Sequence, residues 1–415
     1  MTLHRIEFTR RQWRIFIGCS LSYFSAYLAR LNLSAALGSL MAEMRLTGAQ
    51  GGLLQTVFAF VYALGQFVNG AIVDRVSARR YILLGLILTG LFNLLFGLAT
   101  EYWMLVLLWA LNGAAQSMLW TPLVKLMAAW FRGRRRSQVS FGITVMLIAA
   151  NLCAWTLSGI LASSVSWRWS FILPAVWVVL AGAASWLILR DRPEPGEDLG
   201  EDEAPTAPAR SSDKMRLRSM LFTTGLVQIL ICCVGNGFVR DGIITWAPTI
   251  ISRLDSRGTM NPTFTSLIIP VLNLFGVLLA RKAYTVFRGN SRRGTAVLML
   301  GSAALAFVLI PASGNVFTCA LVLGLCCSLT YGVNPLLTTI IPMEYEGAGR
   351  VGLVAGMMDA FIYVGSALAG VVTGVVSDAT GWHAVFILWG ATSAAACAAA
   401  LMSVRGARKL ENRRA

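Results

Sequence analysis

The stretch DRPEPGEDLGEDEAPTAPARSSDK, residues 191–214, lies near the middle of an otherwise apolar chain. It is acidic and rich in Pro, Gly, Ser and Ala, a composition that cannot bury a core and is typical of a solvated linker. Long apolar segments lie on both sides of it, in equal number. We therefore predict an N-terminal bundle at 1–190, a cytoplasmic linker at 191–216 and a C-terminal bundle at 217–415.

The apolar segments have the length of membrane spans. Of the 415 residues, 56% are hydrophobic and 13% are charged, whereas soluble domains carry about 25% charged residues. A transmembrane helix needs about 20 apolar residues, and twelve segments reach that length. The predicted spans are residues 14–38, 50–73, 81–99, 103–131, 138–163, 168–190, 217–250, 263–287, 293–312, 315–341, 350–377 and 383–405. The sequence thus predicts an all-α membrane protein with twelve transmembrane helices in two pseudo-symmetric six-helix bundles.

The basic residues predict the orientation of the chain. Lys and Arg number 35 against 19 Asp and Glu, and the bases gather in short segments between spans, such as RGRRRS (132–137) and RGNSRR (288–293). This pattern indicates cytoplasmic loops rather than nucleic-acid binding. Both termini are expected in the cytoplasm of a multi-pass plasma-membrane protein, at the inner membrane if the source is bacterial. We expect no signal peptide, because the basic N-terminus leads directly into a full-length span.

Three basic residues lie deeper in the spans: Arg30, Lys125 and Arg240. Lys125 is about two helical turns from the cytoplasmic end of its span, so its side chain is expected to reach the surface. Arg30 and Arg240 lie deeper, where a charge costs about 2.5–3.5 kcal/mol on insertion scales. They occupy comparable places in the first helix of each half. Transporters built from repeats place their substrate site between the halves near mid-membrane, so we expect both arginines there.

Other polar residues in the spans have a simpler interpretation. The eight cysteines show no metal-binding or disulfide spacing and are interpreted as small packing residues. Five asparagines are expected mainly to form interhelical hydrogen bonds: Asn32, Asn112, Asn151, Asn236 and Asn273.

The segment GAIVDRVSARR (70–80) connects the second and third spans. It resembles the pattern Gly-x-x-x-Asp-Arg-x-Gly-Arg-Arg of the major facilitator superfamily (the MFS fold). The resemblance implies that Asp74, Arg75, Arg79 and Arg80 are gating elements on the cytoplasmic side. The alternative is a charged loop that anchors a helix hairpin.

Four further stretches carry a closer resemblance. They are YFSAYLARLNLSAA (23–36), LNGAAQSMLWTPLVKLMAAWF (111–131), RDGIITWAPT (240–249) and FRGNSRRG (287–294). Together they resemble the organophosphate:phosphate antiporter family, the glycerol-3-phosphate and hexose-phosphate exchangers. The resemblance implies that Arg30 and Arg240 bind the phosphate group of the substrate. An anion between two guanidiniums relieves their repulsion through charge-assisted hydrogen bonds.

The same resemblance extends to residues that line the cavity. Tyr23, Tyr27 and Trp120 fall on such positions, and Gln116 lies one turn from Trp120. Three positions differ from the family: a lysine is replaced by Gln66, a histidine by Leu147 and a tyrosine by Gly237. The eleventh span carries Asp359 and Tyr363, and Asp359 stands where the family is apolar.

The two acids near the site leave alternatives open. Asp359 pairs with Arg240 or Arg30, takes up a coupling proton, makes a helix-facing polar contact, or meets the amine of a zwitterionic substrate. Asp241 is not expected to neutralise Arg240, because adjacent residues on a helix point about 100° apart.

The sequence therefore predicts a secondary active transporter of a small organic anion, an organophosphate or a carboxylate. Arg30 and Arg240 grip the substrate during alternating access, with inorganic phosphate or a proton as the coupling ion. The substrate-binding residues are expected to be Arg30, Arg240, Tyr23, Tyr27, Trp120, Gln116, Gln66, Asp359 and Tyr363. Proton-coupled carboxylate symport through Asp359 and a transporter-like sensor of a sugar phosphate are the alternatives. We expect a monomer in the lipid bilayer, with no cofactor, no metal and no nucleic-acid partner, and no enzyme activity, because no catalytic cluster or Gly-Lys phosphate-binding loop is present.

Overall fold

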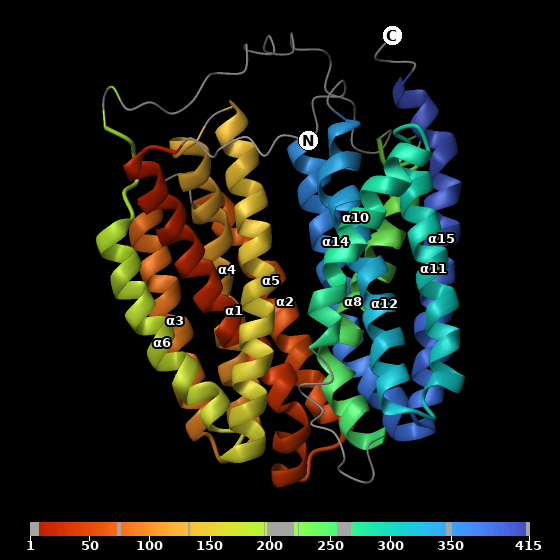
Figure 1. The fold of residues 1–415 in the computed structure, drawn as a ribbon, viewed down its shortest axis with the longest axis horizontal. Coiled ribbons are helices and arrows are strands. Elements are labelled where there is room, and N and C mark those ends of the chain that lie inside the picture. The colour runs from red at the N-terminus through yellow and green to blue at the C-terminus, as the bar shows by residue number, and fades with distance from the viewer. Residues whose placement is uncertain are drawn as a thin grey trace. The chain divides into compact units, whose positions relative to one another are not determined.

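The computed structural model describes residues 8–72, 76–131, 133–194, 196, 220–222, 224–254, 267–345 and 351–411. Within these ranges the chain is helical and contains no strand. The first half of the sequence forms α1 (Arg10–Met44), α2 (Gly48–Ile72), α3 (Ala78–Leu98), α4 (Tyr102–Trp130), α5 (Gly133–Ser164) and α6 (Trp169–Ile188). The second half forms α8 (Leu226–Leu254), α10 (Ile268–Val286), α11 (Ser291–Ala312), α12 (Val316–Pro335), α14 (Val351–Thr380) and α15 (Trp382–Glu411) (Figure 1). The all-α prediction is confirmed, and each of these helices overlaps one predicted span.

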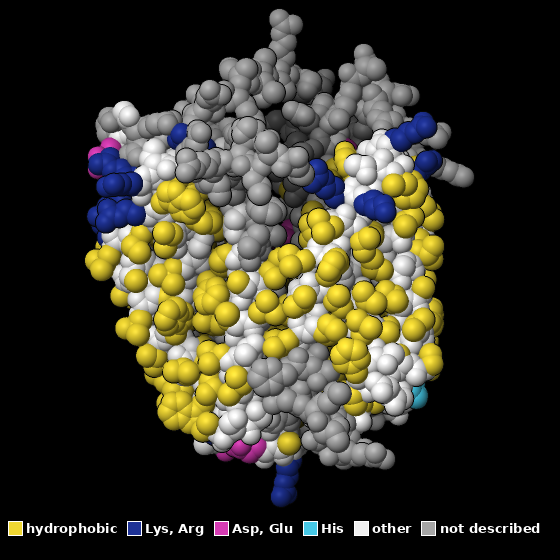
Figure 2. Space-filling model, viewed as in Figure 1, with side chains coloured by type: hydrophobic (Ala, Val, Ile, Leu, Met, Phe, Trp, Pro, Cys, Tyr) yellow, Lys and Arg dark blue, Asp and Glu magenta, His cyan; other side chains and the backbone are white. Residues whose placement is uncertain are grey.

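The helices have the surface of a membrane protein. Ten of them are long and apolar enough to cross a bilayer. Large hydrophobic side chains are exposed along them, and Lys and Arg side chains gather mostly at one end (Figure 2). Exposing such apolar faces to lipid tails costs no free energy, whereas exposing them to water does. The chain is therefore a multi-pass membrane protein; the cytoplasmic location of its termini stays a prediction.

The chain divides into two compact units. The first comprises Met1–Ser39 and Phe60–Thr206, and the second comprises Leu40–Ala59 and Ala207–Ala415. The end of α1 and the first half of α2 therefore belong to the second unit. Most of the expected linker, 191–216, lies outside the described residues, so the domain boundaries proposed from the sequence stay a prediction.

The third helix of each half begins with the same capping device. The Ser77 side chain accepts a hydrogen bond from the Arg80 amide at the start of α3, and the Asn290 side chain accepts one from the Arg293 amide at the start of α11. Both caps lie in the basic motifs seen in the sequence. Satisfying an otherwise unpaired N–H fixes where each helix begins.

Glycines bring α8 and α14 into backbone contact. A Cβ on Gly237 would overlap the Ile362 carbonyl oxygen, and one on Gly365 would overlap the Val234 carbonyl oxygen. Small residues permit such close approach between membrane helices. A tyrosine at position 237, as in the resembling family, has no room in this packing.

The predicted seventh span, 217–250, is interrupted near its start. Residues 220–222 are helical, and α8 begins at Leu226. Gly225 precedes it with a φ of +73°, and a residue in the left-handed region interrupts a helix. A second difference is the π-helical turn Leu336–Ile340, which directly follows α12; the apolar pattern gave no sign of it.

Within the second unit, α14 caps the beginning of α2. The Asp378 carboxylate accepts hydrogen bonds from the Gly48 amide at 3.0 Å and the Ala49 amide at 2.9 Å. The Thr56 hydroxyl donates to the Ala367 carbonyl oxygen at 2.5 Å. A carboxylate at a helix N-terminus satisfies unpaired N–H groups and complements the helix dipole.

Replacing Asp378 by alanine should loosen the first turn of α2. Loss of an N-terminal cap costs about 0.5–2 kcal/mol, which corresponds to about a 2- to 30-fold increase in local opening. Hydrogen exchange of the Gly48 and Ala49 amides measures this directly. Asp378→Asn, which keeps an acceptor oxygen, should show a smaller increase. Unchanged exchange in Asp378→Ala would contradict the capping role.

Candidate anion-binding site

Arg30, on α1 in the first unit, contacts a glutamine and two tyrosines. Its Nε donates to the Gln116 Oε1 at 2.8 Å, and its Cζ lies 5.2 Å from the Tyr27 ring centroid and 4.4 Å from that of Tyr62. The Gln116 amide in turn donates to the Ala29 carbonyl oxygen at 3.0 Å. The guanidinium is thus oriented by a hydrogen bond and by the faces of two aromatic rings, which attract cations.

Aromatic residues continue this surface. The Tyr23 and Tyr27 ring centroids are 5.2 Å apart, and those of Tyr23 and Trp120 are 5.0 Å apart. Tyr23 is buried, whereas Tyr27 and Trp120 are half-buried. The three residues that the resemblance assigns to a cavity wall therefore do form one continuous aromatic cluster beside Arg30.

Gln66 links two helices of the first unit. Its Nε2 donates to the Tyr62 Oη at 2.7 Å, and its Oε1 accepts a hydrogen bond from the Thr121 hydroxyl at 3.1 Å. Tyr62 belongs to α2 and Thr121 to α4. The glutamine that replaces the family's lysine thus positions the phenol ring that lies over Arg30. Tyr62 is not among the residues predicted from the sequence.

Arg240, on α8 in the second unit, is bound to an acid. Its Nε lies 2.7 Å from the Asp241 Oδ1, its Nη2 donates to the Oδ2 at 3.0 Å, and its Nη1 donates to the Asn334 Oδ1 at 2.8 Å. The exposed fractions of the Arg240 and Asp241 side chains are 13% and 15%. The expectation that Asp241 does not face Arg240 is wrong.

The reason lies in the reach of the arginine side chain. Neighbouring Cα–Cβ bonds on a helix diverge by about 100°, but this angle governs only the first atoms of a side chain. The long methylene stem of Arg240 lets its guanidinium turn back, and its planar fork matches both oxygens of a carboxylate.

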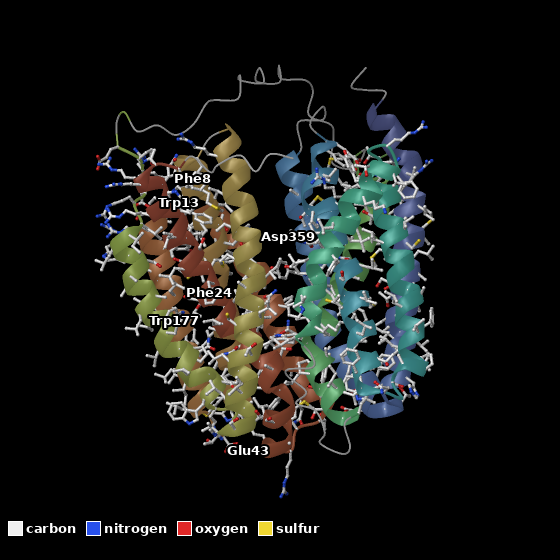
Figure 3. All side chains as sticks on the ribbon, viewed as in Figure 1. Phe8, Trp13, Phe24, Glu43, Trp177 and Asp359 are labelled. Atoms are coloured by element: carbon white, nitrogen blue, oxygen red, sulfur yellow. The ribbon has the colours of Figure 1, made fainter. Side chains whose placement is uncertain are left out.

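Asp359 does not contact Arg240 directly. It lies on α14 (Figure 3), is exposed, and interacts electrostatically with Arg240 without forming an ion pair with it among the described residues. Tyr363 follows one turn later and is half-buried. Of the alternatives for Asp359, a fixed ion pair with Arg240 is therefore not formed, because Asp241 occupies that place.

The asparagines of the spans differ in their hydrogen bonding. Asn32 donates to Asn93 at 2.9 Å and Asn112 donates to the Ala29 carbonyl oxygen at 3.1 Å, so the prediction of interhelical hydrogen bonds is confirmed for both. Asn236, fully buried one turn before Arg240, has no hydrogen-bond partner for either side-chain atom among the described residues. A buried amide without partners costs free energy, and its position adds a polar group beside Arg240.

The gating motif is described only in part, since Asp74 and Arg75 lie outside the described residues. The Arg79 Nε donates to the Trp186 carbonyl oxygen at 2.7 Å, and its Cζ lies 3.7 Å from the Trp186 ring centroid. Arg80 is exposed. Arg79 thus joins α3 to α6 within the first unit, and the gating role of all four residues stays a prediction.

The side chain of Lys125 extends out of the apolar part of its span, as predicted. Its Nζ donates to the Val76 carbonyl oxygen at 3.1 Å, in the connection between α2 and α3. The side chain runs from α4 to this connection, so its charge is removed from the apolar part of the span, as expected for a snorkelling lysine.

A bundle of apolar helices with guanidiniums inside its spans is the arrangement expected of a membrane transporter. Residues 19–351 match the Major Facilitator Superfamily, and the chain belongs to that superfamily.

Relatives match most of the chain. It is 25% identical over 402 residues to the probable hexose phosphate transport protein of Chlamydia trachomatis, covering 90% of this chain and 87% of that one. It is 25% identical over 400 residues to the glycerol-3-phosphate transporter of Bacillus subtilis, covering 92% and 89%. The membrane sensor protein UhpC of Escherichia coli is 26% identical over 405 residues, with 93% and 91% covered. The predicted resemblance to the organophosphate:phosphate antiporters is confirmed.

Solved structures share the fold. A bacterial homologue of the human lysosomal transporter Spinster has a TM-score of 0.74 at 16% identity, covering 98% of this chain and 99% of that one. The nucleoside transporter NupG has a TM-score of 0.73 at 14% identity, covering 94% and 98%. At these identities the similarity concerns the fold alone.

Proposed function

We propose that this protein is a secondary active transporter of a small organic anion, with a phosphate ester as the favoured class, that works by alternating access. The observation that carries the proposal is the setting of Arg30. Its guanidinium lies inside a membrane helix, oriented by Gln116 and by the rings of Tyr27 and Tyr62. A cation fixed in this way is suited to bind an anion in charge-assisted hydrogen bonds.

Arg240 is the second arginine of the proposal. It occupies the place in the first helix of the second half that corresponds to Arg30 in the first, and relatives of this chain are named for hexose phosphate and glycerol-3-phosphate. We propose that one substrate anion engages both arginines, in exchange for inorganic phosphate. Tyr23, Tyr27 and Trp120 would then contact the organic part of the substrate.

Transport assays in liposomes test this proposal. The purified protein is reconstituted into phosphate-loaded liposomes, and uptake of labelled phosphate is followed with and without external glycerol 3-phosphate. We expect saturable uptake that glycerol 3-phosphate inhibits and that protein-free liposomes lack. Absence of both uptake and inhibition would reject organophosphate exchange, and labelled carboxylates under a pH gradient would then test symport through Asp359.

A sensor is the second candidate function, because the chain is about as similar to a membrane sensor protein as to the transporters. A sensor binds the same class of ligand but does not need to carry it across the membrane. Binding of glycerol 3-phosphate without any flux would favour this candidate.

A further inference from the structure

The contact between Arg240 and Asp241 has a consequence for anion binding. Three of the five guanidinium N–H groups of Arg240 are used, two by Asp241 and one by Asn334. The carboxylate occupies the fork that a phosphate or carboxylate substrate would use. Asp241 is therefore an internal anion in the position of a substrate anion.

The carboxylates near Arg240 in the second unit oppose the binding of a substrate anion. Two carboxylates in the spans of this unit act on Arg240: Asp241 contacts it directly, and Asp359 interacts with it electrostatically. In the first unit, the described acids Glu101, Asp191 and Glu194 lie only at helix ends. An anion that approaches Arg240 thus meets two carboxylates, and like charges repel strongly in a medium of low dielectric constant.

We propose that Asp241 is a proton-coupling residue: it takes up one proton when the substrate anion replaces its carboxylate on Arg240. The inference rests on the proposed function and adds a proton that accompanies each anion at the same site. The proton comes from water and binds to a carboxylate oxygen of Asp241, while no covalent bond of the substrate is broken. For a singly charged anion, the net charge beside Arg240 is then the same before and after binding.

The pair can be broken without moving the backbone. Asp241 and Arg240 are neighbours on one helix, so a change of side-chain rotamer separates them, and such changes are fast. The half-buried position of both side chains, at 13% and 15% exposure, leaves a path for the anion and the proton.

The groups around the Arg240–Asp241 pair indicate that Asp241 is the acid affected when an anion binds to Arg240. From α12, Cys327, Tyr331 and Asn334 face it. From α14, Asp359 and Tyr363 interact with Arg240. Further titratable groups near this part of α8 are the thiols of Cys232 and Cys233 on the same helix and of Cys397 on α15. Among the described groups, Asp241 forms the ion pair with the guanidinium, so anion binding at Arg240 acts first on Asp241.

Linkage gives the expected size of the effect. When one proton is taken up with each anion, the affinity for the anion rises about tenfold for each unit by which the pH falls. Removing the titrating carboxylate removes this component of the pH dependence. It also removes the competitor, so an Asp241→Asn variant is expected to bind anions at least about tenfold more tightly at pH 8.

Calorimetry tests the proposal on the full-length protein in detergent. Glycerol 3-phosphate and inorganic phosphate are titrated into the wild type and into Asp241→Asn, in two buffers with different enthalpies of ionisation. The difference in heat between the buffers gives the number of protons taken up for each anion bound. Because the ligand's own titration is common to both proteins, the wild type is expected to take up about one proton more than Asp241→Asn.

Two further variants make the test specific. Asp241→Glu keeps a carboxylic acid next to Arg240 and is expected to retain the proton uptake, which provides a readout if the asparagine variant does not fold. Asp359→Asn removes the other carboxylate in a matched way and is also expected to retain it. Loss of uptake in Asp359→Asn with retention in Asp241→Asn would overturn the proposal.

The outcomes separate the two proposals. Anion binding by the wild type with no more proton uptake than Asp241→Asn would overturn the role of Asp241 and leave the transported class intact. If the wild type binds neither glycerol 3-phosphate nor phosphate at any pH, the proposed function fails, and the inference fails with it.

Discussion

Replacing Arg30 by lysine is expected to lower the rate of anion transport about 100-fold or more. Lysine keeps the positive charge but has no Nε–H to donate to Gln116 and no planar group to stack between Tyr27 and Tyr62. Two charge-assisted hydrogen bonds, each worth about 1.5–3 kcal/mol, depend on this fixed fork. The loss therefore tests geometry rather than charge.

Initial rates of labelled phosphate uptake into phosphate-loaded liposomes measure the effect. Arg14→Lys is the matched control, because Arg14 is an exposed residue of the same helix, and its uptake should equal that of the wild type. If Arg30→Lys transports within about threefold of the wild type, the guanidinium of Arg30 does not bind the anion through its fork.

The setting of Arg30 shows how far the sequence predicts this site. The position of Arg30 within an apolar run follows directly from hydropathy, and Gln116 was selected because it lies in the same motif as Trp120. The structure joins Arg30 and Gln116 by a hydrogen bond. The structure thus brings together two residues from separate spans that recognisable motifs single out, and their role in substrate binding stays a prediction.

The remaining contacts could not be predicted in the same way. Tyr62 lies in an apolar span outside any motif, and which helix face it occupies depends on how α2 packs. Asn334 does carry a signal in the sequence, since it is a polar residue inside the predicted span 315–341. Asp241 was misjudged because the rule for helix faces describes Cβ directions and not the reach of a long side chain.

A second residue with a large expected effect lies in the stretch FRGNSRRG, residues 287–294. Arg292, at the start of α11, has a fully buried side chain. Its Nη1 donates to the Thr224 carbonyl oxygen at 2.7 Å and to the Ser403 carbonyl oxygen at 2.5 Å, and its Nη2 lies 3.2 Å from the Glu344 Oε2. One side chain thus joins the residues before α8, the residues after α13 (Ile341–Met343) and the end of α15.

Tyr345 completes this network. Its Oη accepts a hydrogen bond from the Arg292 Nη2 at 3.3 Å and lies 2.9 Å from the Thr224 hydroxyl. Burial raises the pKa of Tyr345 above its ordinary value of 10.0, so the phenol stays protonated at neutral pH. Glu344, which also accepts a hydrogen bond from Ser291, is then the one anion that contacts Arg292 among the described residues.

Replacing Arg292 by leucine is expected to lower the free energy of unfolding by about 3–5 kcal/mol, because it removes the ion pair of Glu344 and the hydrogen bonds to two carbonyl groups. Unfolding of the purified protein in detergent micelles, followed by circular dichroism, measures the loss. Arg293→Leu is the matched control: Arg293 is the next residue and is exposed, so its replacement should change the free energy by no more than about 0.5 kcal/mol. Equal losses in the two variants would mean that the basic charge of the segment matters and the buried network does not. A loss confined to Arg292→Leu would show that FRGNSRRG is a structural junction of the second unit, separate from the anion site at Arg240.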